Sequence, residues 1–152
     1  MRKNLTPLIA TLTLAVVSAW GASPQTGSGA KPVSAKPAGV QTIAHGQQVS
    51  LIDYLSPGRT TVFDFSSEFC PPCRALAPQL DKLHRAVKDI VVVKVNINRP
   101  GARGIDWKSP VAQQYDLHSI PHLKVFGADG KLKAEGKEAQ TMVSQWIRQL
   151  RP

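Results

Sequence analysis

Cysteine is scarce in this sequence, with two residues among 152, and aromatic side chains make up only 6% of the chain. The sequence also lacks an arginine-rich tract and any alternation of aromatic and basic residues, which are patterns typical of nucleic-acid-binding segments. Its longest apolar run, residues 5–17, is shorter than the about 20 residues that a membrane-spanning helix needs. We therefore expect no nucleic-acid partner, and the short apolar run needs another explanation.

The N-terminus has the layout of a secretory signal peptide. Met1, Arg2 and Lys3 form a short basic start, residues 5–17 are apolar, and small residues such as Ser18 and Ala19 follow. This order of regions predicts a signal peptide over residues 1–21, and hence export. An uncleaved membrane anchor is the alternative interpretation of the same segment.

The remainder of the chain divides into a linker and one domain. Residues 22–39 are rich in Ser, Pro, Gly, Ala and Lys, which predicts a flexible linker. Residues 40–152 have the size of a single domain. Residues 41–152 hold 15 basic and 10 acidic side chains, so much of the formal net charge of +9 remains there. Because these charges are scattered, we interpret them as a solvated surface, with attraction to acidic partners or lipid headgroups as the alternative.

The two cysteines form the pattern Cys70-Pro71-Pro72-Cys73, between a β-prone run and a segment with apolar residues at helical spacing. A disulfide that closes so short a loop removes little entropy from the unfolded chain, so a purely structural role is unfavourable. A cysteine at a helix N-terminus is also activated, because the helix dipole favours its thiolate. The pattern therefore indicates redox chemistry, and a structural disulfide or a metal site is the alternative.

The order of elements predicts an α/β domain. A strand, a helix and a second buried strand make a βαβ unit with parallel neighbours, and a helix, a β-hairpin and a last helix follow. Ser109-Pro110 is a strong helix start, because serine caps a helix and proline suits its first position. The sequence predicts strands over 40–43, 60–65, 90–97, 123–126 and 132–134, and helices over 50–55, from the cysteine turn to 87, from 109, and over 141–150.

An ordered set of residues resembles the pattern of the thioredoxin family, from residue 40 to the end of the chain. It consists of a strand Asp-Phe, the two cysteines, a helix proline, a strand lysine, an Ile-Pro pair and a turn glycine: Asp64-Phe65, Cys70, Cys73, Pro78, Lys94, Ile120-Pro121 and Gly130. The resemblance implies a thioredoxin-like fold, with a central mixed β-sheet flanked by helices on both faces. The sequence departs from the family at Phe69 and Ser66, where tryptophan is common, and at Pro71-Pro72, where the family has Gly-Pro.

The resemblance also implies roles for individual residues. Cys70 is expected to attack a partner disulfide, and Cys73 to resolve the mixed disulfide that results. Asp64 would accept the proton of Cys73, and because a buried carboxylate is costly we expect its pKa to be raised. Lys94 is either a charge that tunes Asp64 or a solvated lysine. Pro121 is expected to follow a cis peptide bond.

A second group of residues is expected to contact the substrate. The resemblance places Phe69, Pro71 and Pro72 beside the reactive sulfur, and the Ile120 backbone before Pro121 where it could pair with an extended peptide. His122 comes next and is included with them. The alternative for His122 is an ordinary strand residue without a role in binding.

The two prolines indicate the direction of the reaction. Neither has an N–H group or a charge, and no histidine lies between the cysteines, so they contribute nothing that stabilises the Cys70 thiolate. A reduction potential below about −180 mV is therefore predicted.

Together with the resemblance, this predicted potential implies a periplasmic protein-disulfide reductase of a Gram-negative bacterium. We expect a monomer with a membrane electron donor and with no organic cofactor or bound metal. The alternatives are a disulfide oxidase or isomerase of the same fold, and a copper- or zinc-binding chaperone.

Overall fold

The computed structural model describes residues 35–150. The predicted signal peptide lies outside the described residues, as does most of the predicted linker. No helix within the described part of the chain is long and apolar enough to cross a membrane.

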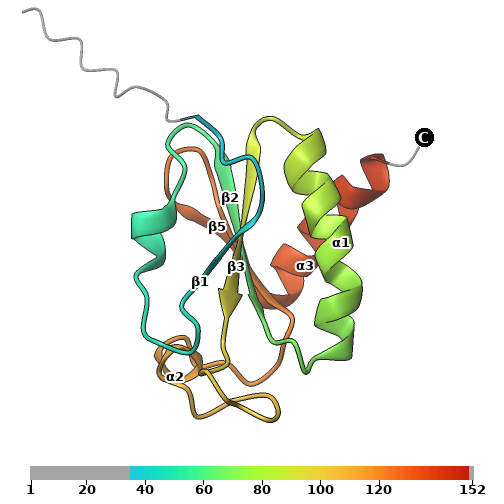
Figure 1. Ribbon diagram of the computed structural model, residues 1–152. Helices are drawn as coiled ribbons and strands as arrows, with labels where there is room; N and C mark the ends of the chain where they lie inside the picture. Colours follow the sequence, from blue (N-terminus) through green and yellow to red (C-terminus); the bar gives the residue numbers. More distant parts are fainter. Residues whose placement is uncertain (1–34, 151–152) are drawn as a thin grey trace, which may run out of the picture. The chain divides into compact units, whose positions relative to one another are not determined.

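A five-stranded mixed sheet forms the centre of the domain (Figure 1). The strands are β1 (Gln41–Ile43), β2 (Thr60–Ser66), β3 (Ile90–Asn96), β4 (His122–Phe126) and β5 (Leu132–Glu135). Their spatial order is β1-β3-β2-β4-β5, with β3 parallel to β1 and β2, and with β4 antiparallel to β2 and β5. The predicted βαβ unit contains β2 and β3, and the predicted hairpin is formed by β4 and β5.

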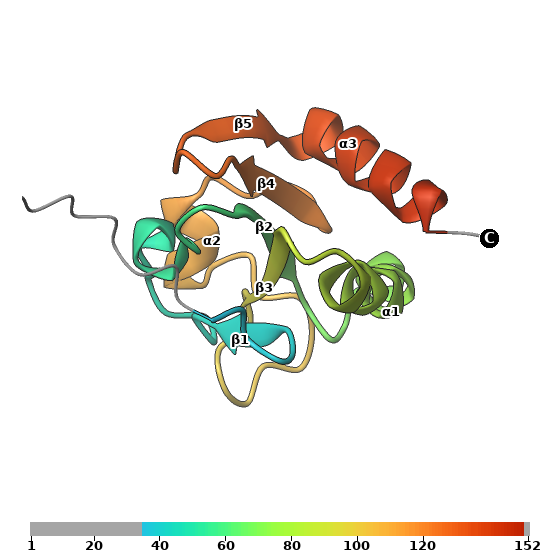
Figure 2. The same cartoon turned by 90° about the horizontal axis from the view of Figure 1, so that it is seen from above.

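Helices cover both faces of the sheet, as predicted (Figure 2). One face carries α1 (Pro71–Ala86) and α3 (Gly136–Gln149), and the other carries α2 (Pro110–Gln114) and the short 3-10 helix η1 (Leu51–Tyr54). Each face has its own cluster of buried apolar side chains. The sheet therefore separates two cores, and a strand residue belongs to one or the other according to the face on which it lies.

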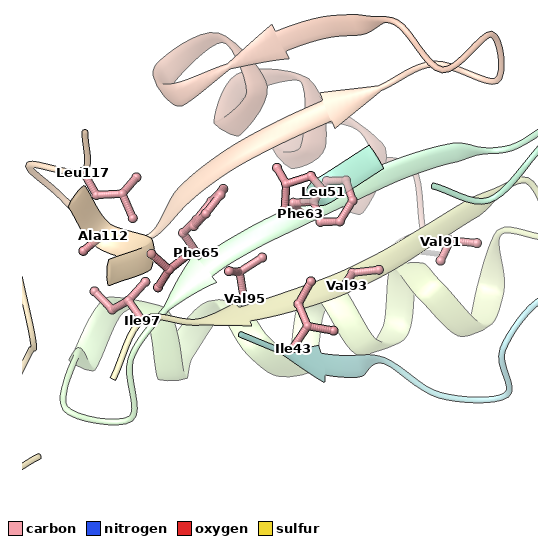
Figure 3. Packing of buried hydrophobic residues seen from close by; sticks show 11 residues of the cluster. Ile43, Leu51, Phe63, Phe65, Val91, Val93, Val95, Ile97, Ala112 and Leu117 are labelled. Carbon is pink, nitrogen blue, oxygen red and sulfur yellow. The ribbon is translucent and has the colours of Figure 1, made fainter. Parts of the chain in front are cut away.

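Strand β2 shows this separation most clearly. Phe63 and Phe65 belong to the core beneath η1 and α2, together with Val93 and Val95 of β3 (Figure 3). Val62 belongs to the core beneath α1 and α3. Because side chains alternate along a strand, Asp64 lies on the same face as Val62. An acidic side chain is thus placed beneath α1, the helix that begins at the cysteine motif.

The predicted start of α2 is correct, whereas the predicted helix over 50–55 and the predicted start of α3 differ from the structure. The Ser109 hydroxyl accepts a hydrogen bond from the Ala112 N–H at 3.3 Å, so Ser109 caps α2 as predicted. Ser50 makes no side-chain cap, and the segment after it forms only one 3-10 turn. Helix α3 begins at Gly136 rather than at 141, because Gly136 takes a φ of 58° that lets the chain turn directly out of β5.

The described end of the predicted linker contacts the domain at the last turn of α1. The Lys36 ammonium donates hydrogen bonds to the carbonyl oxygens of His84 and Val87. The His84 Nδ1 accepts a hydrogen bond from the Val92 N–H at 3.0 Å, so the ring carries its proton on Nε2, which donates to the Pro37 carbonyl at 3.0 Å. A fully buried histidine thus joins the chain before β1 to α1 and β3.

Candidate active site

The cysteine motif lies where β2 ends and α1 begins. Two hydrogen bonds to Ser67 shape the turn, since its carbonyl accepts from the Cys70 N–H at 3.2 Å and its hydroxyl accepts from the Phe69 N–H at 3.1 Å. Cys70 is the N-cap of α1, as the sequence predicts, and its sulfur is bonded to that of Cys73. The pair is therefore a disulfide at the positive end of a helix.

The Cys70 residue is buried, whereas its neighbours in the motif are exposed. The Cys73 N–H donates a hydrogen bond to Cys70 Sγ at 3.2 Å, and both cysteines are 2% exposed. Pro71 and Pro72 are exposed, and Phe69 is 39% exposed. The backbone thus supplies one donor to the sulfur, and an apolar, accessible rim of three residues surrounds the disulfide.

The Ile120-Pro121 pair lies next to Cys70. Its peptide bond is cis, as the resemblance implies. The Ile120 carbonyl oxygen lies 3.7 Å from Cys70 Sγ. Ile120 and Pro121 are both half-buried. Two segments that are 50 residues apart in the chain therefore meet at the reactive sulfur.

Asp64 is buried beneath α1, with 2% of its surface exposed. Within the described residues its Oδ1 has no hydrogen-bond partner. Burial raises the pKa of Asp64 to about 6, and the charge of Lys94 and a hydrogen bond from Ser66 oppose this rise. The predicted upward shift is confirmed.

A cavity of about 220 Å³ connects Asp64 with α1. Ala77 is four residues after Cys73 on the same helix, and side chains at this spacing share one face. The cavity beside the Asp64 carboxyl therefore reaches the face of α1 that also carries Cys73. It is lined by Val40, Thr42, Asp64, Ala77, Leu80, Asp81, Val92 and Lys94.

The thioredoxin family model matches residues 44–149. The chain belongs to the thioredoxin family. It is a thioredoxin-type protein-disulfide oxidoreductase, and its redox-active group is the Cys70–Cys73 disulfide.

Thioredoxins from bacteria are among its relatives. The chain is 40% identical to the thioredoxin of Chlamydia caviae over 70 residues, which are 46% of this chain and 60% of the relative. It is 32% identical to the thioredoxin of Rhodospirillum rubrum over 98 residues, which are 62% of this chain and 86% of the relative.

Solved thioredoxins share the fold at low sequence identity. Oxidised thioredoxin O2 from Arabidopsis thaliana aligns with a TM-score of 0.51 at 22% identity, over 76% of this chain and 96% of the plant protein. The thioredoxin of Plasmodium falciparum aligns with a TM-score of 0.51 at 20% identity, over 74% of this chain and all of the parasite protein. The thioredoxin-like fold is thus shown by both sequence and structure.

In this thioredoxin-family site, His122 lies on the sheet face opposite Asp64. Its Nε2 donates to Glu135 Oε1 at 3.1 Å, and its ring meets the Phe65 ring edge-on at 5.9 Å between centroids. Lys124 pairs with the same Glu135 oxygen at 2.6 Å, and this hydrogen bond is the main reason that the pKa of Glu135 is lowered. A contact between His122 and substrate stays a prediction.

The metal-chaperone alternative would use Cys70, Cys73 and His122 as ligands. In the structure the two cysteines are bonded to each other, and His122 is paired with Glu135. Among residues 35–150, no group of three or more His, Cys, Asp or Glu side chains is arranged to hold a metal ion. All three expected ligands are thus engaged in other contacts in this state.

Gln140 belongs to the site although its sequence context gives no sign of this. Its Nε2 donates a hydrogen bond to the Pro121 carbonyl at 2.6 Å. The predicted last helix starts at 141, one residue after it, whereas α3 includes it. Ser67 was also missed, because a serine in a turn before a cysteine has no distinctive spacing.

Proposed function

We propose that this thioredoxin-family protein reduces disulfide bonds of other proteins in the periplasm. The observation that carries the chemistry is the disulfide at the N-terminus of α1, with the Ile120 carbonyl 3.7 Å from Cys70 Sγ and an exposed apolar rim around it. The predicted signal peptide supports the location.

The proposed reaction exchanges two thiols for one disulfide. The Cys70 thiolate attacks one sulfur of the substrate disulfide, a mixed disulfide forms, and the first substrate thiolate leaves. The Cys73 thiolate then attacks Cys70 Sγ, which releases the second substrate thiolate and leaves the Cys70–Cys73 disulfide. Two electrons pass from the protein to the substrate, which takes up two protons.

Asp64 accepts the proton that Cys73 must lose before it attacks. A pKa of about 6 suits this role, because the carboxyl is mostly ionised at neutral pH yet more basic than an ordinary aspartate. The cavity between Asp64 and α1 supports a short proton path, direct or through a water molecule. In this proposal Lys94 is the tuning charge, since it opposes the effect of burial on Asp64.

The substrate binds across the rim of the disulfide. Phe69, Pro71 and Pro72 offer apolar contact to the residues around the substrate cysteine. Ile120 offers its backbone to an extended segment, in the manner of an added strand beside Pro121. His122 directly follows Pro121, at the start of β4, and is the polar residue of this proposed surface.

The reduced form must be restored by another dithiol. In an oxidising compartment the electrons have to come from a donor that reaches across the membrane, so a membrane protein is the proposed partner. One relative of the fold, thioredoxin f2, has been solved in complex with ferredoxin:thioredoxin reductase, with a TM-score of 0.52 at 17% identity. Because electrons enter this protein through the Cys70–Cys73 disulfide, the proposed donor must also reach that end of the domain.

Two experiments test the proposal. The full chain, with dithiothreitol as electron donor, should accelerate the reduction of insulin disulfides, and Cys70→Ser should abolish the acceleration.

For the location, the full chain with a C-terminal tag is produced in a Gram-negative bacterium, which is then fractionated. Release with the periplasmic fraction is expected, recovery with the membranes would favour the uncleaved anchor, and recovery in the cytoplasm would refute export.

A further inference from the structure

Gln140 contacts the loop beside Cys70 from a helix that is remote in the sequence. It lies in the second turn of α3 and is half-buried. Its Nε2 donates to the Pro121 carbonyl at 2.6 Å. Only the nitrogen end of a side-chain amide can bond a carbonyl oxygen, so this contact fixes how the amide is oriented.

The Ile120 and Pro121 carbonyl groups are joined by a stretch of backbone that has little rotational freedom. Each belongs to a planar peptide unit, and the proline ring fixes the φ angle between the two units. The ψ angle of Pro121 is then the one soft dihedral that joins them. Holding the Pro121 carbonyl therefore limits the motion of the Ile120 carbonyl, which lies 3.7 Å from Cys70 Sγ.

The surroundings of the contact make the Gln140 donor important. Leu76, Leu123, Val143 and Ser144 line a cavity of about 200 Å³ together with Pro121 and Gln140. Leu123 and Val143 are each 1% exposed and offer the Pro121 carbonyl no hydrogen bond, and the side-chain donor that the structure shows for it is Gln140, not Ser144. A carbonyl that loses its donor in such a place is left unsatisfied, or it turns toward another partner.

We propose that Gln140 is a positioning residue for protein substrates, which acts by holding the Ile120-Pro121 loop in the orientation that an incoming segment pairs with. This inference rests on the proposed function, in which the Ile120 backbone binds the segment around the substrate disulfide. Gln140 does not touch the sulfur atoms. It therefore affects the binding of a polypeptide and leaves the sulfur chemistry unchanged.

Three variants test the role of Gln140. Gln140→Glu keeps the shape of the side chain but removes the N–H donor, and Gln140→Lys keeps a donor of similar reach. Gln145→Glu introduces the same charge at an exposed position of the same helix and is the matched control. The reduced full-length proteins are mixed with excess insulin, or with the small disulfide 5,5′-dithiobis(2-nitrobenzoic acid), and formation of the Cys70–Cys73 disulfide is followed by rapid quench.

Gln140→Glu should raise the insulin concentration needed for the half-maximal rate by about threefold to tenfold, which corresponds to one lost hydrogen bond. Its maximal rate, its rate with the small disulfide and its equilibrium with glutathione should stay within about twofold of the wild type. Gln140→Lys should recover most of the insulin effect, and Gln145→Glu should behave as wild type.

An unchanged insulin dependence in Gln140→Glu would overturn the proposal, and so would an equal loss with both disulfides, which indicates a general structural effect. The proposed function fails in a different way. If the proposed function is wrong, the wild-type protein reacts with the small disulfide but not with insulin. Gln140 then has no role in binding a protein substrate, and both proposals are overturned.

Discussion

Asp64 on β2 and Lys94 on β3 occupy the same register position of two neighbouring parallel strands. Their side chains therefore leave the sheet on the same face, beneath α1. Asp64 is buried and Lys94 is half-buried, and the lysine charge opposes the rise in the carboxyl pKa that burial causes. The pair places a titratable acid with a pKa of about 6 in the core next to the redox site.

Asp64→Asn should stabilise the oxidised protein at neutral pH and should slow its turnover. The folded-state pKa lies above the ordinary value of 3.8, so the folded protein binds the proton more tightly than the unfolded chain does. The stability of the wild type should then fall as the pH rises from about 4 to about 6, by up to ~3 kcal/mol. Urea unfolding of wild type and Asp64→Asn at pH 4 and pH 8 measures the difference.

The gain from Asp64→Asn should be small at pH 4 and largest at pH 8. Asp53→Asn, at an exposed position of η1, is the control for the loss of one carboxylate. Equal stabilisation by Asp64→Asn at the two pH values would contradict a buried, raised carboxyl.

Lys94→Met should raise the pKa of Asp64 above its wild-type value, because it removes the nearby charge that opposes the effect of burial. The carboxyl carbon of Asp64, followed by NMR as the pH is changed, reports its titration directly. The pH at which insulin reduction reaches half its maximum should move upward with it. Lys82→Met, exposed on α1, is the matched control, and a titration that is identical in all three proteins would contradict the coupling.

The sequence correctly predicted those parts of the site whose properties follow from local chemistry. Cys70 precedes two prolines, which suit the first turn of a helix, and it does cap α1. An acid in an apolar strand predicted the raised pKa of Asp64, because burial alone is enough to cause it. Pro121 was predicted to be cis from the family resemblance, since nothing local to Ile120-Pro121 requires it.

The parts that were missed depend on tertiary contacts. Gln140 reaches Pro121 across 19 residues, through a hydrogen bond that leaves no periodic signal. The early start of α3 was missed because its first turns contain Ala139 as the only buried residue, and a single small side chain gives little amphipathic pattern. The pairing of His122 with Glu135 requires the β4–β5 hairpin, whose register the sequence does not set.

His84→Leu should destabilise the protein at pH 7 by about 2 kcal/mol, because it leaves the buried Val92 N–H unpaired. Burial is the main reason that the pKa of His84 is lowered from 6.5. The hydrogen bond to the Pro37 carbonyl and the charge of Asp81 oppose this shift, and Lys36 and Arg85 add to it. The wild type should therefore lose stability as the pH falls below about 6.5, toward the lowered pKa of the folded state.

The difference between wild type and His84→Leu should consequently shrink between pH 7 and pH 5, as measured by thermal unfolding. His118→Gln, at an exposed position, is the control for the loss of one imidazole. A constant difference across this range would show that His84 does not titrate in the folded protein in the way described.

Pro72→His should make the disulfide more oxidising. The wild-type motif gives the Cys70 thiolate no donor from Pro71 or Pro72, and the Cys73 N–H is the donor that the sulfur has in the structure. A cationic imidazole between the cysteines stabilises the thiolate, and hence the reduced form. Equilibration with glutathione should place the wild type below about −180 mV and Pro72→His above the wild type, with Pro72→Gln as the uncharged control. A wild-type potential above about −180 mV would contradict the assignment as a reductase.

The most direct test of the central claim is to trap the mixed disulfide. Full-length Cys73→Ser is produced in a Gram-negative bacterium, thiols are blocked with acid and an alkylating agent, and its adducts are separated without reductant. We predict proteins linked to Cys70 that dithiothreitol releases, and none in the double variant Cys70→Ser, Cys73→Ser. No adducts in Cys73→Ser, or adducts in equal amount in the double variant, would contradict a reaction that proceeds through Cys70.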